Sequence, residues 1–254
     1  RSCVRGIVIT FNDISRIKQL ENAIERSKRL AALGEMAAGV AHEIRNPLGG
    51  IEMFSSLLER ELTGDERKRG IAQKIIEGVR SLNKIVTGLL TFTRSLKKTH
   101  FRHVDLVDAL EVSLSFARKE FEEKSITAVK NVDNSIPLYV KGDSDQLKQV
   151  FLNIFLNAAQ AIRHNNGVIH ISCAACQSEG YVRLEISDNG CGMKKECLEK
   201  IFDPFFTTKD HGTGLGLAIS YRIIDAHGGR ITVESEINNG TRFQIFLPLM
   251  QGVK

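Results

Sequence analysis

Two successive helical segments with regular apolar seams constrain the fold of this chain more than any other feature. In the second segment, seam positions alternate at spacings of four and three: Ile71, Ile75, Gly78, Leu82, Ile85, Leu89, Phe92 and Leu96. The first segment has a similar pattern: Leu30, Leu33, Ala37, Val40, Ile44, Ile51, Phe54 and Leu58. Residues 62–65 (Leu-Thr-Gly-Asp) predict a tight turn between them. Because one hairpin cannot bury both seams, we expect two hairpins to pack as a four-helix bundle in a homodimer.

A histidine stands in the first helix, within Ala41–Leu48 (Ala-His-Glu-Ile-Arg-Asn-Pro-Leu). Pro47 lacks an amide hydrogen and clashes with the preceding turn, so the helix should bend there. Val40 and Ile44 belong to the seam, which turns His42 away from it and toward solvent. Taken alone, such a residue is more often an ordinary surface histidine. The rest of the chain gives it another interpretation.

The composition excludes several functional classes. At 254 residues, with 42% hydrophobic and 26% charged residues, the chain is typical of globular proteins of one large or two modest domains. It shows no apolar run of about twenty residues and no signal peptide, so we expect a cytoplasmic fragment without membrane contact, whatever anchor lies upstream. The net charge of +5 is mild and scattered, which argues against nucleic-acid binding.

The five cysteines show no disulfide or metal framework. Cys173 and Cys176 fall in a strand-like run, where their odd spacing places them on opposite faces. This argues against a zinc knuckle or a redox pair, and the odd total fits a reducing compartment.

The periodicity divides the chain into four parts. Residues 1–13 alternate like a strand and, since one strand cannot fold alone, should end an upstream domain. Residues 14–27 are expected to be a connecting helix whose heptad slips near Ser27, and residues 28–97 to be the hairpin. From 98 to 254 the pattern is mixed helix and strand.

This last part is expected to be an α/β sandwich, an α+β arrangement of one sheet with helices on a single face. Helices are predicted over 106–123, 144–164 and 212–227. Strands are predicted over 103–105, 126–131, 138–141, 168–176, 181–187, 230–236 and 240–247.

Four segments of the last part share a chemistry. Asn153 and Asn157 are four residues apart, so they share one helix face among core residues. A buried amide lowers stability unless it binds a partner. The amide oxygen is a suitable ligand for Mg²⁺. Either asparagine alone is equally compatible with N-capping or a buried hydrogen bond. Asp188 follows a strand and can accept from an adenine amino group, with Gly190 and Gly192 allowing close approach.

The other two segments are an aromatic cluster and a glycine-rich loop. Phe202–Lys209 combines phenylalanines without regular period and a cation that can reach phosphate. Residues 212–217 (Gly-Thr-Gly-Leu-Gly-Leu) lead into a helix, whose N-terminal amides suit a polyphosphate. The loop is neither a Walker loop nor a dinucleotide fingerprint, because no Gly-Lys-Ser/Thr follows and no strand precedes it.

Together and in this order, these segments resemble the bacterial sensor histidine kinases of two-component systems. Ala41–Leu48 matches the phospho-acceptor box and Asn153–Ala161 the N box. The first glycine box, the F box and the second glycine box match 188–193, 202–209 and 212–216. The resemblance covers roughly residues 28–250. The sequence Pro-Phe-Phe-Thr-Thr-Lys is similar to that of nitrogen- and metal-responsive sensors, and residues 1–13 resemble the end of a PAS domain.

The resemblance implies a dimerisation and phosphotransfer domain over 28–97 and a catalytic ATP-binding domain over 98–254. His42 would be phosphorylated by ATP, with Glu43 as general base or hydrogen-bond partner. Asn46 would orient water that dephosphorylates the partner, a response regulator phosphorylated on aspartate.

For the nucleotide, the resemblance implies that Asn157 ligates Mg²⁺ with help from Asn153, and that Asp188 reads adenine. Gly190 and Gly192 would give the base room. The phosphates would be held by Lys209 and the second glycine box: Gly212, Thr213, Gly214, Leu215 and Gly216. Residues 193–213 would form a mobile lid and 96–101 a hinge.

One residue departs from the family pattern. Many members carry Lys or Arg three residues after the second asparagine, where this chain has Gln160, so that phosphate contact falls to Lys209 or Arg163. Two rival functions fit parts of the chain: an ATPase clamp that shares only the nucleotide fold, and a catalytically silent dimeric adaptor. The His42 segment argues against the first, and the intact nucleotide segments argue against the second.

Overall fold

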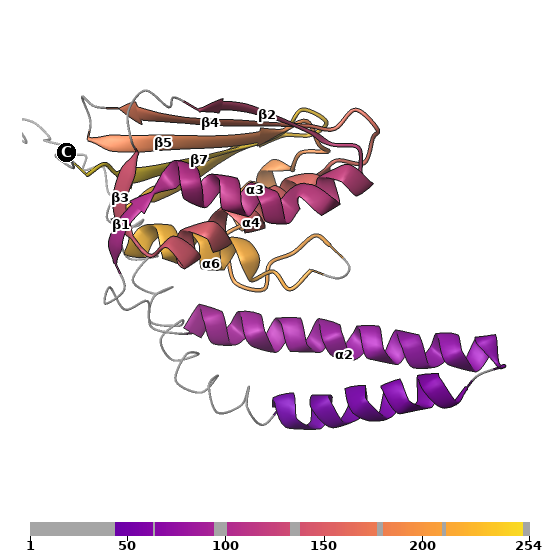
Figure 1. The fold of residues 1–254 in the computed structure, drawn as a ribbon. Coiled ribbons are helices and arrows are strands. Elements are labelled where there is room, and N and C mark those ends of the chain that lie inside the picture. Colours follow the sequence, from indigo (N-terminus) through magenta and orange to yellow (C-terminus); the bar gives the residue numbers. More distant parts are fainter. Residues whose placement is uncertain are drawn as a thin grey trace, which may run out of the picture.

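A computed structural model describes the following parts of the chain (Figure 1): residues 44–62, 64–93, 101–132, 138–176, 180–209 and 212–250. Residues 44–61 are helical, and helix α2 (Glu66–Thr93) returns alongside them. Gly64 has φ +114°, which L-residues rarely adopt, so the predicted turn requires its glycine. The predicted upstream strand, connecting helix, His42, Glu43 and most of the hinge lie outside the described residues.

The two helices of the hairpin pack through residues other than the predicted seams. Buried residues of the hairpin are Leu48, Ser55, Ala72, Ile76, Val79 and Val86. Seam residues that are exposed in the single chain are Ile44, Ile51, Phe54, Leu58, Ile71, Ile75 and Leu82. Arg80 Nε and Glu52 Oε1, 3.0 Å apart, form an ion pair across the hairpin. One hairpin therefore leaves much of both seams uncovered, as the sequence predicts.

The remaining described residues form a two-layer domain around a five-stranded sheet in the order β2-β4-β5-β7-β6. The strands are β2 (Thr127–Val132), β4 (Val168–Cys176), β5 (Tyr181–Asp188), β6 (Arg230–Glu236) and β7 (Gly240–Pro248). β2 and β4 run parallel, and the other neighbours are antiparallel. The prediction of a single sheet is wrong, because β1 (Arg102–Asp105) and β3 (Tyr139–Gly142) pair in a separate two-stranded sheet.

Helices cover one face of the larger sheet, as predicted, and the hairpin lies beyond them on the side of α6 (Figure 1). The three covering helices are α3 (Leu106–Glu123), α4 (Ser144–Ala161) and α6 (Gly216–Ala226). The core lies between these helices and the sheet, where Phe151, Ile154 and Phe155 of α4 are fully buried. No helix in the described ranges is long and apolar enough to cross a membrane.

Two predicted helix boundaries are wrong. α4 ends at Ala161 rather than His164, because Ile162 has extended backbone angles (φ −79°, ψ 118°). α6 begins at Gly216 rather than Gly212, because Gly214 has φ +65° and cannot continue a right-handed helix. A four-residue helix, α5 (Lys195–Leu198), lies within the predicted lid.

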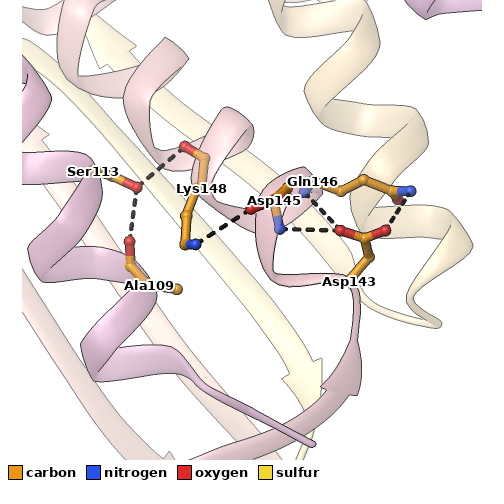
Figure 2. Close-up of polar contacts among 6 residues, drawn as sticks. All are labelled: Ala109, Ser113, Asp143, Asp145, Gln146 and Lys148. Atoms are coloured by element: carbon orange, nitrogen blue, oxygen red, sulfur yellow. Dashed lines mark hydrogen bonds and ion pairs between the residues drawn. The ribbon is translucent and has the colours of Figure 1, made fainter. Parts of the chain in front are cut away.

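Helix α4 is fixed at its N-terminus by side-chain hydrogen bonds (Figure 2). Asp143 Oδ1 accepts from the backbone N–H groups of Asp145 (3.0 Å) and Gln146 (3.2 Å), and Gln146 Nε2 donates to Asp143 Oδ2 at 3.3 Å. Ser113 Oγ of α3 lies 3.2 Å from the carbonyl oxygen of Lys148, a hydrogen-bond distance that ties α3 to α4. These contacts set the position of the helix that carries Asn153 and Asn157.

Asp143→Ala should lower the free energy of unfolding of this domain by about 1 kcal/mol, because two backbone N–H groups lose their acceptor. Urea unfolding measures the change. Asp145→Ala is the matched control: its side chain is exposed and pairs with Lys148 at the surface, so its loss should cost well under about 0.5 kcal/mol. Equal losses in the two variants would contradict the capping role of Asp143.

Candidate nucleotide-binding site

The first asparagine of α4 joins this helix to α6. Asn153 Nδ2 donates to Ser220 Oγ at 3.0 Å, and Ser220 Oγ donates to the carbonyl oxygen of Gly216 at 3.1 Å. A Cβ on Gly216 would lie 2.3 Å from Asn153 Oδ1, so the glycine permits the close approach of the two helices. The contacts of Asn153 match the hydrogen-bonding interpretation, and its assistance to Mg²⁺ stays a prediction.

Lys209 places a positive charge on the same face of α4, one turn further along. Its Nζ donates to Asn157 Oδ1 at 2.7 Å and also to Gln160 Oε1. The residue as a whole is exposed, but partial burial of its ammonium lowers the pKa of Lys209, and the nearby charge of Lys124 lowers it further. The structure therefore brings together two residues that the sequence analysis assigned to Mg²⁺ and to phosphate.

The donor set fits a magnesium ion that is shared with phosphates. Asn157 Oδ1 already faces a cation, the Lys209 ammonium, and a hard amide oxygen is a suitable Mg²⁺ ligand. Among the residues that the structure describes, no group of three or more His, Cys, Asp or Glu side chains could hold a metal ion. In proteins, Mg²⁺ commonly keeps several waters and is bound by one or two protein side chains together with substrate phosphates.

Sequence reasoning missed a second cation beside α4. Lys124, directly after α3, donates from Nζ to the carbonyl oxygen of Ala159 at 3.0 Å and lies 3.2 Å from Glu120 Oε1. Arg163, which the sequence analysis considered as a phosphate ligand, is exposed. Lys124 belongs to no motif, and only the packing of α3 on α4 brings it here.

Asp188 ends β5, the middle strand of the sheet, and is only 9% exposed. Its Oδ1 accepts from the backbone N–H of Gly190 at 2.8 Å, and the backbone N–H of Thr241 also donates to this carboxylate. Burial raises the pKa of Asp188 to about 6, and the two hydrogen bonds oppose the rise. A buried carboxylate with spare lone pairs can accept a hydrogen bond from an amino group of a ligand.

A network behind Asp188 was also missed. Ser235 Oγ of β6 accepts from Met193 N at 2.9 Å and lies 2.7 Å from the carbonyl oxygen of Gly240 and 3.0 Å from Thr241 Oγ1. Thr241 stands opposite Asp188 in the β5–β7 ladder. This juxtaposition depends on strand order, which the local sequence pattern does not specify.

The glycines after Asp188 make room for the chain itself. A Cβ on Gly190 would lie 2.7 Å from the carbonyl carbon of Ala161, and one on Gly192 would lie 1.9 Å from Glu236 O. Gly192 also has φ +63°, a conformation that favours glycine. The close approach that each glycine permits within the chain is therefore to backbone, and the approach of an adenine base stays a prediction.

The glycine-rich loop packs on the aromatic segment that precedes it. A Cβ on Gly212 would lie 2.4 Å from Thr207 Oγ1, and one on Gly214 would lie 2.4 Å from the carbonyl carbon of Phe205. Lys209 N donates to Thr207 Oγ1 at 3.1 Å. The loop and the segment that carries Lys209 are thus one packed unit.

The loop leads into a helix terminus that can receive an anion. Thr213 Oγ1 accepts from Leu215 N at 3.3 Å, and the side chain of Leu215 is buried. The N-cap residue of α6, Leu215, makes no capping hydrogen bond through its side chain, so the amides of the first turn can serve an anion. The structure thus gathers the nucleotide residues around α4, whereas Asn46 lies exposed on the hairpin.

Comparison with known proteins gives two family matches. Residues 32–97 match the family described as "His Kinase A (phospho-acceptor) domain". Residues 142–251 match the family described as "Histidine kinase-, DNA gyrase B-, and HSP90-like ATPase". Neither match includes residues 1–13, so the PAS-like end and the sensor subgroup stay predictions.

Similar proteins are histidine kinases. "Signal transduction histidine-protein kinase AtoS" of Escherichia coli (strain K12) is 38% identical over 244 residues, which are 96% of this chain and 39% of AtoS. The crystal structure of histidine kinase ThkA in complex with response regulator protein TrrA is 31% identical, with a TM-score of 0.64 over 95% of this chain and 69% of that one. Full-length ShkA in complex with AMPPNP is 26% identical, with a TM-score of 0.73 over 87% and 47%.

The chain spans about half or less of the length of the curated relatives that it matches. The phospho-acceptor match covers the hairpin, and the ATPase match covers most of the two-layer domain that follows it. This order and the likeness to ThkA show that the chain belongs to the sensor histidine kinases.

Proposed function

We propose that this chain is the transmitter part of a sensor kinase, which phosphorylates His42 from ATP and passes the phosphoryl group to an aspartate of a response regulator. The observation that carries the proposal is the convergence on α4 of a buried carboxylate (Asp188), an amide–cation pair (Asn157 and Lys209) and the helix N-terminus at Gly216. These groups suit the adenine, the Mg²⁺-bound phosphates and the terminal phosphates of one nucleotide.

In the proposed reaction, a ring nitrogen of His42 attacks the γ-phosphorus of ATP, and the bond to the bridging oxygen of ADP breaks. Glu43 orients the imidazole or, as general base, takes the proton from its other ring nitrogen. Asn157 would hold Mg²⁺ together with the phosphates, and the bound ion would supply positive charge next to the leaving group. Such a transfer depends mainly on positioning and electrostatics, which the nucleotide residues supply.

The hairpin supplies the acceptor and the docking site for the partner. ThkA was solved in complex with a response regulator, and we infer the same class of partner here. Asn46 is exposed on the hairpin, and we propose that it orients water for dephosphorylation of that partner. We further propose that the working unit is a homodimer, because one hairpin leaves its seams exposed. The proposed domain limits are 28–97 and 98–254.

The proposal is tested with ATP labelled on its γ-phosphate in the presence of Mg²⁺. The chain should acquire a phosphate that is lost in acid and stable in base, as expected for phosphohistidine. It should then transfer the label to a receiver domain of its source organism. ATP hydrolysis without labelled protein would favour the ATPase clamp, and absence of nucleotide binding would favour the silent adaptor.

Affinity for ADP should fall as the pH drops through about 6. The pKa of Asp188 is raised to about 6, so its carboxylate is ionised above this pH and loses its charge below it. A charge-assisted hydrogen bond to adenine then becomes a neutral one, which should weaken binding by up to about tenfold. Calorimetric titration with ADP measures this change. The titrations run from about pH 5.5 to about pH 7.5, a range that brackets the pKa of about 6.

Asp188→Asn is the control for this titration, since it should bind ADP weakly without the step that belongs to the carboxylate. Because a raised pKa means that the folded state binds more protons, this carboxylate lowers stability as the pH rises from 3.8 through about 6. The asparagine variant should therefore be at least as stable as the parent at neutral pH, which separates lost binding from unfolding. A step that persists in the variant would contradict the assignment.

A further inference from the structure

Gln160 departs from the cation that the family resemblance implies at this position, and its contacts indicate a role of its own. Gln160 and Asn157 lie three residues apart on α4, so their side chains share one face of the helix. Both amide oxygens accept a hydrogen bond from the same atom, Nζ of Lys209. The positive charge thus comes from the segment before α6, and the helix supplies neutral acceptors.

The charges around this contact favour a neutral residue at position 160. Lys124 already lies close enough to lower the pKa of Lys209. A lysine in place of Gln160 would add a third cation at the site and would remove the acceptor. Gln160 is therefore matched to Lys209, and the two residues together replace a helix-borne cation.

The same contact places Lys209 in competition with a metal ion. Asn157 Oδ1 lies 2.7 Å from Nζ of Lys209. Mg²⁺ binds oxygen ligands at about 2.0–2.1 Å, so an ion on this oxygen would stand close to the ammonium, and the two cations would repel each other. Ligation of Mg²⁺ by Asn157 therefore favours movement of the Lys209 ammonium away from this oxygen.

A movement of Lys209 would be transmitted to the glycine-rich loop. The backbone N–H of Lys209 donates to Thr207 Oγ1, and Gly212 packs directly on Thr207. Gly214 packs in the same way on the backbone of Phe205. Because these approaches leave no space for even a Cβ, the loop and the Lys209 segment should shift together.

We propose that Gln160 is a positioning residue that holds Lys209 beside Asn157, and that Mg²⁺ with its nucleotide displaces this lysine and thereby repositions the loop before α6. The inference rests on the proposed function, because it takes Asn157 as the Mg²⁺ ligand. Beyond that function, the inference adds the exchange of the Lys209 ammonium for Mg²⁺ at Asn157. It also names Gln160 as the residue that sets how firmly Lys209 is held.

The first experiment uses the whole chain with Gln160→Leu, which removes the second acceptor and leaves Asn157 and Lys209 in place. Without nucleotide, hydrogen exchange at 201–209 and 212–216 should become about fivefold faster, because Lys209 is held less firmly. The Mg²⁺ concentration that gives half-maximal ADP binding should fall by a similar factor, because the competing ammonium is weaker. Lys200→Gln, which removes an exposed lysine from the same region, should change neither quantity.

A charge exchange provides the second experiment. Gln160→Lys alone should speed exchange in the same peptides, because it places like charges together. Combining it with Lys209→Gln restores one cation and one acceptor with their positions reversed, and protection should return. Failure of the double variant to regain protection, or an unchanged Mg²⁺ midpoint in Gln160→Leu, would overturn the inference while leaving the kinase proposal intact. A parent chain that binds no ADP at any Mg²⁺ concentration would overturn both.

Discussion

His42→Gln should acquire no phosphate from labelled ATP, whereas its affinity for ATP should stay within about twofold of that of the parent chain. Glutamine preserves the size and polarity of the side chain but offers no nucleophilic ring nitrogen. The predicted nucleotide residues belong to the two-layer domain and not to the hairpin, so the substitution should leave them unchanged. Autoradiography after denaturing electrophoresis measures the label, and calorimetry measures the affinity.

A second histidine gives the matched control. His170 is exposed on β4, and its replacement by glutamine should leave labelling at the level of the parent. Label retained by His42→Gln, or lost equally in both variants, would contradict the assignment of the acceptor. Loss of ATP binding together with labelling would point to a folding defect, and circular dichroism of the variant distinguishes this outcome.

The parts of the fold that depend on local signals were predicted from sequence. The final hairpin has positive φ at Asn238 (64°) and Gly240 (81°), as its Asn-Asn-Gly turn indicates. The segments 168–176 and 181–187, both predicted as strands, are β4 and β5 and pair antiparallel across a short connection. In contrast, the parallel pairing of β2 with β4 and the separate sheet of β1 and β3 join segments distant in sequence, so neither alternation nor turn chemistry specifies them.

In the site, too, local spacing and motifs predicted some residues, whereas residues brought in by long-range packing were missed. The shared face of α4 followed from helical spacing, and the contact of Lys209 with Asn157 joins two residues that the motifs had selected. Ser220 and Thr241 were missed because they reach the site only through the packing of α6 and the order of the strands. Gly192 has no room for a Cβ beside Glu236 O, so the chain itself requires a glycine there, and its role toward adenine stays a prediction.

The hairpin shows how a correct periodicity can be assigned to more than one interface. The seam through Ile71, Ile75 and Leu82 is exposed in the single chain, and the neighbouring positions Ala72, Ile76 and Val79 make the contact within the hairpin. Both sets recur at helical spacing, one residue apart. α2 therefore carries one apolar stripe for its own hairpin and another that remains for a second copy.

Leu82→Glu should dissociate the proposed dimer. Leu82 is 48% exposed in the single chain and lies on the seam that we assign to the second hairpin. Burial of a leucine contributes about 2 kcal/mol, and a symmetric dimer contains two, so the dimer should lose about 4 kcal/mol before the cost of burying two carboxylates. The dissociation constant should then rise by about a thousandfold or more. Sedimentation equilibrium across micromolar concentrations measures it.

Gln73→Glu is the matched control, because it adds the same carboxylate to an exposed position of α2 outside the seam. It should leave the dimer intact. The fragment from Phe101 to Lys254 holds every nucleotide residue named above, so it should bind ATP in the absence of any dimer and without phosphorylating itself. If Leu82→Glu sediments as a dimer with unchanged affinity, the seam does not form the interface. If it is monomeric and still phosphorylates His42 at the parental rate, the dimer is not needed for the reaction, and each hairpin must receive its phosphate within a single chain.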